Sequence, residues 1–236
     1  MPFDEYFSAI FCINLKSRTD RWEECTLEFA QQKIEKVIRV DGVQGIPPEL
    51  KKYGGMGVYS SRQVTETEEF SRKRLEGRIG CLMSHLKVIK KAKSEKLNRI
   101  LILEDDVQFV SNVQSRFNSI IPRIPEEWQL LYLGGNEKGV QERVNESIVR
   151  VSNMLMAHAI GIDASVYDEL IDLLSECRVP VDTYYAELQK EHACFAVDPY
   201  LAWQRASWSD GDQRFRIYDF ENRMPFLEEM LKTKTQ

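Results

Sequence analysis

Two kinds of hydrophobic pattern divide this chain into predicted strands and helices. The run 100–103, Ile-Leu-Ile-Leu, is apolar at every position, which is typical of a strand that helices cover on both faces. Between 79 and 96 apolar residues recur at helical spacing, which predicts a helix with one face in the core. On the same grounds we expect strands over 7–15, 36–40, 128–133, 148–151 and 194–197, helices over about 20–32 and 164–175, and an interrupted helix over 110–121.

The order of these elements predicts an α/β fold. A strand, a turn, a helix and a second strand open the chain, as in the first half of a nucleotide-binding unit. No G-x-G-x-x-G follows the first strand and no G-x-x-x-x-G-K occurs, so neither a dinucleotide fingerprint nor a P-loop is present. We expect a mostly parallel central sheet flanked by helices, with 44–78 as a long, partly helical excursion.

Three adjacent carboxylates, Glu104, Asp105 and Asp106, directly follow the aliphatic run. They fall at the carboxyl end of the predicted strand, the edge of an α/β sheet where ligands usually bind. Carboxylates so close together repel one another and are costly unless a cation lies among them. The pattern favours a divalent metal site that holds a phosphorylated ligand. The alternative is that Asp105 or Asp106 only caps a following turn.

The length, charge and cysteine pattern of the chain limit the classes of protein to which it can belong. Its 236 residues fit one large domain, or one domain with a small appendage. The formal net charge of −5 argues against a nucleic-acid-binding protein, which would carry a basic surface. An acidic protein that binds a phosphorylated ligand needs positive charge near that ligand. The five cysteines include no C-x-x-C pair and read as reduced core residues. The first twenty residues form neither a signal peptide nor a membrane span, which indicates a cytoplasmic protein.

Two histidines and one isolated aspartate have both a structural and a functional interpretation. Ser84 and His85 lie near the start of the predicted helix 79–96, which leads into the acidic strand. His158, flanked by two alanines, is more typical of a satisfied core histidine than of a ligand. Asp182 stands between a proline and two tyrosines, where it could cap a helix or serve as a functional carboxylate.

Six short blocks occur in a distinctive order along the chain. They are Ile13-Asn14-Leu15 with nearby Arg18 and Arg21, Val40-Asp41-Gly42, Gly80-Cys81-Leu82-Met83-Ser84-His85, Ile102-Leu103-Glu104-Asp105-Asp106, Pro180-Val181-Asp182 and Ser209-Asp210. This ordered set resembles glycosyltransferase family 25, which includes bacterial lipooligosaccharide galactosyltransferases and collagen galactosyltransferases. The resemblance runs from about 8 to 211. We therefore expect a catalytic domain over 1–211 and a C-terminal tail, 212–236, that packs on or extends it.

The resemblance implies a GT-A type nucleotide-sugar-binding fold. It also implies an inverting transfer of a hexose, typically galactose, from a UDP-sugar donor to a hydroxyl of a glycan or of hydroxylysine. The implied cofactor is Mn²⁺, or Mg²⁺, because a divalent ion stabilises the leaving diphosphate. We expect Asp106 to bind this ion directly, while Glu104 and Asp105 share the remaining metal and ribose contacts.

Inversion requires a base on the face opposite the leaving group. Asp182 is the first candidate, and Asp210 is the alternative base or a third metal contact. Further candidates would contact the donor or support its pocket: Asn14, Leu15 and Asp41 at the nucleobase and ribose, Arg18 and Arg21 at phosphate, Asn136 and Gln204 at sugar hydroxyls, and Ser84 and His85 as supports. For Arg18 and Arg21 the alternative is plain surface charge on the first helix.

Two other classes of protein stay open. The acidic run also resembles the first strand of a response-regulator receiver, where an acidic pair holds Mg²⁺, although the next strand ends in Gly134-Gly135-Asn136 and no Lys-Pro pair occurs. A catalytically silent sugar-binding protein of the same fold would keep the same motifs. The sequence leaves the acceptor, the donor hexose and the oligomeric state undetermined.

Overall fold

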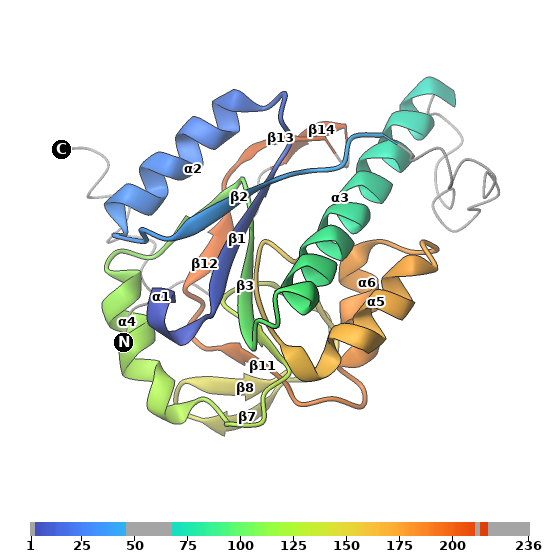
Figure 1. Cartoon of the computed structure of the whole chain (residues 1–236). Coiled ribbons are helices and arrows are strands. Elements are labelled where there is room, and N and C mark those ends of the chain that lie inside the picture. The colour runs from blue at the N-terminus through green and yellow to red at the C-terminus, as the bar shows by residue number, and fades with distance from the viewer. Residues whose placement is uncertain (1–2, 46–67, 211–212, 217–236) are drawn as a thin grey trace.

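An eight-stranded sheet with helices on both faces forms the centre of the protein (Figure 1). The structure, a computed structural model, describes residues 3–45, 68–210 and 213–216. Its helices are α1 (Phe3–Tyr6), α2 (Thr19–Gln31), α3 (Glu68–Ser94), α4 (Val113–Ile120), η3 (Ile121–Arg123), η4 (Ala164–Val166), α5 (Tyr167–Ser175) and α6 (Val181–Leu188). Its strands are β1 (Ala9–Asn14), β2 (Val37–Asp41), β3 (Arg99–Glu104), β4 (Val107–Phe109), β5 (Leu130–Tyr132), β6 (Asn136–Glu137), β7 (Glu142–Asn145), β8 (Ile148–Arg150), β9 (Met154–Leu155), β10 (Ala159–Asp163), β11 (Cys194–Val197), β12 (Ala202–Gln204), β13 (Ser207–Ser209) and β14 (Arg214–Arg216).

The α/β class is as predicted, but the sheet is mixed and not mostly parallel. The strand order is β2-β1-β3-β10-β5-β11-β8-β7. β1 runs parallel to β2 and β3, and β5 runs parallel to β11. The other neighbours, β3 with β10, β10 with β5, β11 with β8 and β8 with β7, are antiparallel. A strand buried on both faces is apolar throughout whichever way it runs, so its pattern does not report its direction.

The aliphatic run in β3 is explained by two separate cores. Ile100 and Ile102 face the core formed with α3, α5 and α6. Leu101 and Leu103 face the core formed with α1, α2 and α4. All four side chains are fully buried because successive residues of a strand point to opposite faces of the sheet. β3 therefore occupies an inner position beside β1, and 100–236 is not a separate receiver module.

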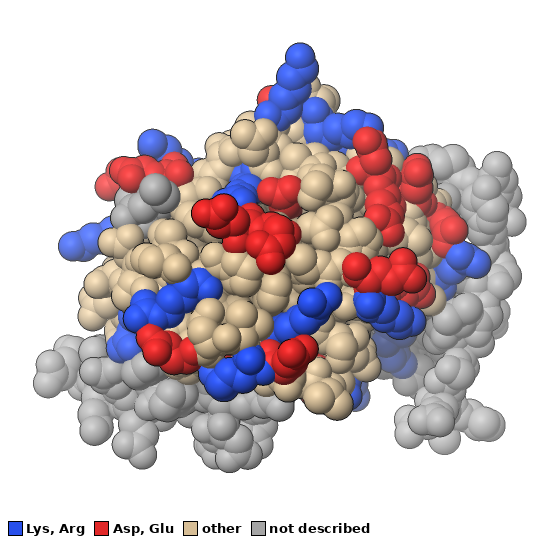
Figure 2. Space-filling view, turned by 90° about the horizontal axis from the view of Figure 1, so that it is seen from below, with Lys and Arg blue, Asp and Glu red and all other residues tan. Residues whose placement is uncertain are grey.

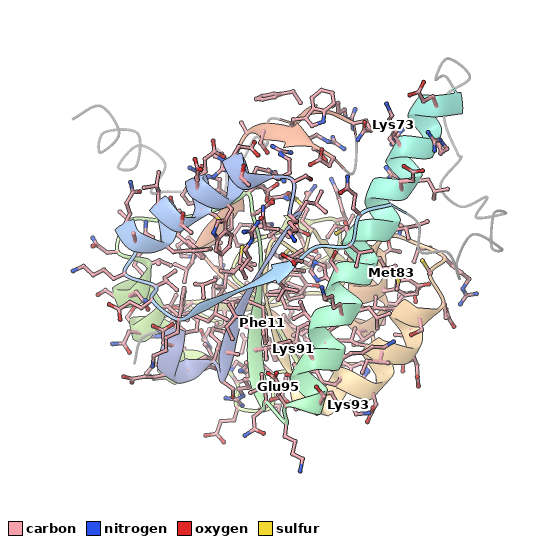
Figure 3. The ribbon with its side chains drawn as sticks, turned by 45° about the horizontal axis from the view of Figure 1, so that its top comes forward. Phe11, Lys73, Met83, Lys91, Lys93 and Glu95 are labelled. Carbon is pink, nitrogen blue, oxygen red and sulfur yellow. The ribbon has the colours of Figure 1, made fainter. Side chains whose placement is uncertain are left out.

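Helix α3 is longer than its hydrophobic pattern predicts. It begins at Glu68, before the predicted start at 79, and residues 46–67 of the predicted excursion lie outside the described residues. Its first turns carry ion pairs one turn apart, Lys73 with Glu69 and Arg72 with Glu76, and so lack the apolar periodicity that marks a buried face. Figure 3 labels Lys73 near the beginning of α3 and Met83 about halfway along it. The adjacent Ser84 and His85 thus lie in the middle of the helix and not near its start.

Two small sheets complete the edge of the molecule at which β1 and β3 end. β12 pairs antiparallel with β4, which places Gln204 opposite Val107, the residue after the acidic triplet. β13 pairs with β14, so the described part of the predicted tail joins a hairpin with 207–209. On the face shown in Figure 2, basic and acidic side chains are interspersed. Among the described helices, none has the length and hydropathy needed to cross a membrane.

Candidate functional site

A cavity of about 430 Å³ lies where β1 and β3 end. Its walls come from four places: the end of β1 with the turn into α2, the turn after β2, the first half of α3, and the acidic triplet with the β12–β13 segment. The lining residues include Ile13, Leu15, Ser17, Arg18, Arg21, Gly42, Val43, Lys73, Gly80, Cys81, Ser84, Glu104, Asp105, Asp106, Gln204, Ser209 and Asp210. The carboxyl ends of parallel strands meet at one edge, which is where α/β sheets bind ligands.

Arg21 supplies a cation within the acidic triplet. Its Nη1 lies 2.6 Å from Asp105 Oδ1, and its Nη2 lies 2.8 Å from Asp106 Oδ2. All three side chains are almost completely buried, so Arg21 is not a surface charge. A planar guanidinium suits two acceptors at once. Part of the positive charge that the triplet demands therefore comes from helix α2, where Arg21 is the third residue.

Asp105 has both carboxylate oxygens bound to protein groups. One accepts from Arg21, and Asn14 Nδ2 donates to the other, Oδ2, over 2.6 Å. Burial raises the pKa of Asp105 to about 6, against the lowering effects of Arg21 and Asn14 and with a further increase from Asp106 and Glu104. Asn14, at the tip of β1, is buried behind this contact and is not among the lining residues. Asp105 and Asn14 thus hold the strand ends together.

Glu104 and Asp106 converge on one amide. Gln204 Nε2 donates to Glu104 Oε2 over 3.2 Å and to Asp106 Oδ1 over 3.3 Å. Burial raises the pKa of Asp106, with Arg21 opposing it and the charge of Glu104 adding to it. Burial also raises the pKa of Glu104, but the hydrogen bond and charge of His85, the charge of His158 and the hydrogen bond of Cys81 together outweigh it, so the net shift is downward. These two carboxylates keep oxygens that bind no arginine.

The other oxygen of Glu104 faces helix α3. His85 Nε2 lies 3.3 Å from Glu104 Oε1, and the Cys81 thiol donates to the same oxygen over 3.5 Å. His85 is fully buried, and its Nδ1 is 3.0 Å from the hydroxyl of Tyr185. Ser84 Oγ donates to Gly80 O and accepts from Val43 N, which ties α3 to the turn after β2. The middle of α3 therefore supports the cavity wall.

Arg18 and Asp210 face each other at the cavity. Arg18 Nη1 lies 2.7 Å from Asp210 Oδ2, and Arg18 also pairs with Asp20. Both Arg18 and Asp210 line the cavity, as does Leu15. Asp41 and Asn136 are exposed and are not among the lining residues. The carbonyl of Asp41 accepts from Lys87, and Asn136 pairs in the β6–β9 ladder.

Asp182 lies close to this site without lining the cavity. It is in the first turn of α6, and its Oδ2 accepts a hydrogen bond from Met156 N over 3.3 Å. Burial raises the pKa of Asp182; the backbone amide of Met156 lowers it and the charge of Glu104 raises it further. Burial is the main reason that the pKa of the Cys81 thiol is raised, and the charges of Glu104 and Asp182 raise it further. Asp182 is therefore near Cys81, on the α6 side of the cavity wall.

Three residues near the site differ from the sequence-based expectation. His158 is fully buried, as predicted, but its hydrogen bonding is poor: within the part of the chain that the structure describes, neither ring nitrogen makes a well-formed hydrogen bond, and the backbone of Ala202 offers only a weak one. Burial lowers its pKa. Cys81 and Gly80 were not predicted to form the wall. A Cβ on Gly80 would lie 2.4 Å from Val43 O, so only glycine allows α3 to approach this turn.

Fold and cavity together define an α/β protein with a polar cavity where β1 and β3 end. The model of glycosyltransferase family 25 (LPS biosynthesis protein) matches residues 7–190. The chain therefore belongs to glycosyltransferase family 25.

The chain is similar to animal members of this family. It is 32% identical over 210 residues to procollagen galactosyltransferase 2 of Mus musculus, and this alignment covers 81% of this chain and 31% of the mouse protein. It is 29% identical over 140 residues to inactive glycosyltransferase 25 family member 3 of Homo sapiens, covering 54% and 22%. The chain thus spans less than a third of the length of either relative. A solved mannose-1-phosphate geranyltransferase from Thermus thermophilus is similar with a TM-score of 0.41 and 10% identity, over 90% of this chain and 75% of that one.

Proposed function

We propose that this chain is an inverting, metal-dependent hexosyltransferase domain that uses a UDP-sugar, with galactose as the transferred sugar. The acceptor is a hydroxyl of a glycan or of hydroxylysine. Family membership supports glycosyl transfer, and the name of the mouse relative supports galactose. The observation that carries the proposal is the convergence of Glu104 and Asp106 in a cavity of about 430 Å³, within the roughly 300–1,000 Å³ usual for small-molecule sites.

The residues at this point fit a hard divalent ion. Glu104 Oε2 and Asp106 Oδ1 both accept only from the amide nitrogen of Gln204 among the described residues, so a cation between them would replace one weak donor. Carboxylate oxygens suit Mn²⁺ and Mg²⁺, and Gln204 can turn to present its amide oxygen. Asp105 does not fit as a ligand, because Arg21 and Asn14 bind both of its oxygens. Glu104 and Asp106 would hold the ion, which would stabilise the charge of the leaving diphosphate as a Lewis acid.

Arg18 is the residue that we propose for the diphosphate. Arg21 is committed to Asp105 and Asp106, whereas the partners of Arg18 are the more exposed Asp20 and Asp210. Exchanging Asp210 for a phosphate oxygen would keep a charge-assisted hydrogen bond to the same guanidinium. In a chain with net charge −5 this local positive charge offsets part of the repulsion between donor and protein.

Asp182 is the proposed base. A base must accept the proton of the acceptor hydroxyl as that oxygen attacks the anomeric carbon. Burial raises the pKa of Asp182, which makes its carboxylate a stronger proton acceptor than an exposed one. Asp210 is the alternative base, since it lines the cavity directly, but its Oδ2 is already paired with Arg18 Nη1.

A ligand-dependent melting experiment tests the donor and the metal together. The chain is heated with UDP, GDP and UDP-galactose, each with and without Mn²⁺. A ligand present at one hundred times its dissociation constant adds about 2.7 kcal/mol to the free energy of unfolding, so specific binding should raise Tm clearly. We expect UDP and UDP-galactose to act only with Mn²⁺. Stabilisation that is equal for UDP and GDP, or independent of Mn²⁺, contradicts the proposal.

A catalytically silent sugar-binding protein is the second candidate. Two observations favour it: Arg21 pairs with two of the three acidic residues, and one similar relative is itself called inactive. Hydrolysis of UDP-galactose in the absence of acceptor, measured with and without Mn²⁺, separates the candidates. Binding in the melting experiment without any metal-dependent hydrolysis or transfer would favour the silent protein.

A further inference from the structure

A second group of metal-binding side chains lies in the cavity wall. Cys81, His85 and Glu104 each offer one ligand atom, and these three atoms all lie within 4.8 Å of one another. Cys81 and His85 are four residues apart on α3, so they share a face of the helix, and Glu104 ends the neighbouring strand β3. Cys81 and Glu104 line the cavity. The group is therefore open to solutes on one side.

We propose that Cys81, His85 and Glu104 form a site for a borderline-soft divalent ion of the Zn²⁺ class. Thiolate, imidazole and carboxylate are the three ligand types that proteins use for zinc, whereas Mn²⁺ and Mg²⁺ prefer oxygen ligands alone. Three protein ligands would leave a fourth position for water or another ligand. This site is different from the hard-ion position between Glu104 and Asp106.

Tyr185 already orients the imidazole for this role. Its hydroxyl lies 3.0 Å from His85 Nδ1, and this contact turns Nε2 toward Glu104 Oε1. Metal-ligating histidines usually have such a partner on the other ring nitrogen, which sets both the tautomer and the ring orientation. Because His85 and Tyr185 are fully buried, this orientation is held by the surrounding core.

The two oxygens of Glu104 keep the sites apart. Oε1 faces Cys81 and His85, whereas Oε2 faces Gln204 and, through it, Asp106. A soft ion would bind on the Oε1 side, where the thiol and the imidazole are. The two proposals share Glu104, but Cys81 and His85 belong to the soft-ion site alone. A test at Cys81 therefore distinguishes failure of this inference from failure of the proposed function.

Binding exchanges a proton for the metal. The S–H bond of Cys81 breaks, its electron pair forms the bond from Sγ to the ion, and the proton leaves through the cavity to solvent. One proton should thus be released for each ion bound.

Cobalt is the probe for this site, because Co²⁺ replaces Zn²⁺ and a cobalt–thiolate bond has a charge-transfer absorption. The full chain is reduced, freed of metal and titrated with Co²⁺ without any nucleotide sugar. We expect a thiolate-to-cobalt band that saturates at one ion per chain, disappears when Zn²⁺ is added and persists in excess Mn²⁺. Absence of the band in the unaltered chain overturns the proposal.

Substitutions assign the band to this cluster. Cys81→Ser should abolish it, while the matched variant Cys177→Ser, at a buried cysteine outside the cluster, should retain it. Tyr185→Phe should keep the band but weaken Zn²⁺ binding about tenfold or more, as removal of a ligand's supporting partner does. A band that survives Cys81→Ser overturns the assignment.

A chemical measurement covers the case in which Cys81→Ser does not fold. Zn²⁺ should protect Cys81 of the unaltered chain from a thiol-alkylating reagent, as mapped by mass spectrometry, and should leave the labelling of the other four cysteines unchanged. Equal labelling of Cys81 with and without Zn²⁺ contradicts the proposal.

Discussion

Arg21 and Asp105 are joined by an ion pair of 2.6 Å between Nη1 and Oδ1, although 84 positions separate them in the chain. The guanidinium comes from α2 and the carboxylate from the end of β3. Since Arg21 also pairs with Asp106, one buried arginine balances part of the charge of the acidic triplet. This pairing divides the triplet, because it commits Asp105 to the protein and leaves one oxygen each of Glu104 and Asp106 facing only an amide.

Removing the buried cation should destabilise the fold. Arg21→Gln leaves Asp105 and Asp106 buried without their charge partner, and breaking a buried pair in this way typically costs about 3–5 kcal/mol. Urea unfolding would measure the change. Arg178→Gln, at an arginine with a 67% exposed side chain, is the control and should leave the urea midpoint almost unchanged. Similar values for both variants would show that Arg21 is not a structural cation.

Changing each aspartate of the triplet to asparagine should affect metal-dependent UDP binding differently. Asp106→Asn removes a proposed metal ligand, so UDP should no longer raise Tm in the presence of Mn²⁺; because it also breaks the buried pair with Arg21, it should lower Tm without ligand as well. Asp105→Asn breaks contacts to Arg21 and Asn14 and should lower Tm without ligand, while keeping the Mn²⁺ requirement. The opposite pattern would assign the ion to Asp105.

Changing the proposed base should separate chemistry from binding. Asp182→Asn is expected to lower kcat for transfer by roughly 10²–10⁴-fold, the usual effect of a general base, without changing the Mn²⁺-dependent stabilisation by UDP. Asp210→Asn is the matched comparison and should affect KM for the donor more, because Asp210 faces Arg18. A larger loss of kcat in Asp210→Asn would make Asp210 the base.

Because β3 is buried on both faces, replacing a leucine in it should destabilise the protein much more than replacing an exposed leucine. Leu103→Ala empties a fully buried position and should lower the free energy of unfolding by about 2–5 kcal/mol. Leu27→Ala makes the same chemical change on α2, where the residue is 64% exposed, and should cost about 0.5 kcal/mol or less. Chemical denaturation of both variants checks the pair; equal losses would contradict the placement of β3 between two cores.

Several features could be predicted from local pattern alone. The run 100–103 indicated an inner strand, and the structure places it between two cores. The helix predicted over 164–175 was also correct, since η4 and α5 together cover this range and Asp163 accepts from Ser165 N at its start. The motif order indicated the family, which the match over 7–190 confirms. Such features depend on neighbours in the chain, where the spacing of side chains already sets which face each one occupies.

Only the tertiary structure shows how segments far apart in the sequence contact one another. Packing between elements far apart in sequence sets three features that the pattern did not predict. They are the direction of β10, the start of α3 among charged residues, and the convergence of Arg21 and Gln204 on the acidic triplet. The amino-acid sequence determined which carboxylates stand at the strand end. Only the folded chain determined which of their oxygens pair with Arg21 and which face an amide, a thiol or an imidazole, because a carboxylate oxygen binds whichever donor the packing of the elements brings within about 3 Å.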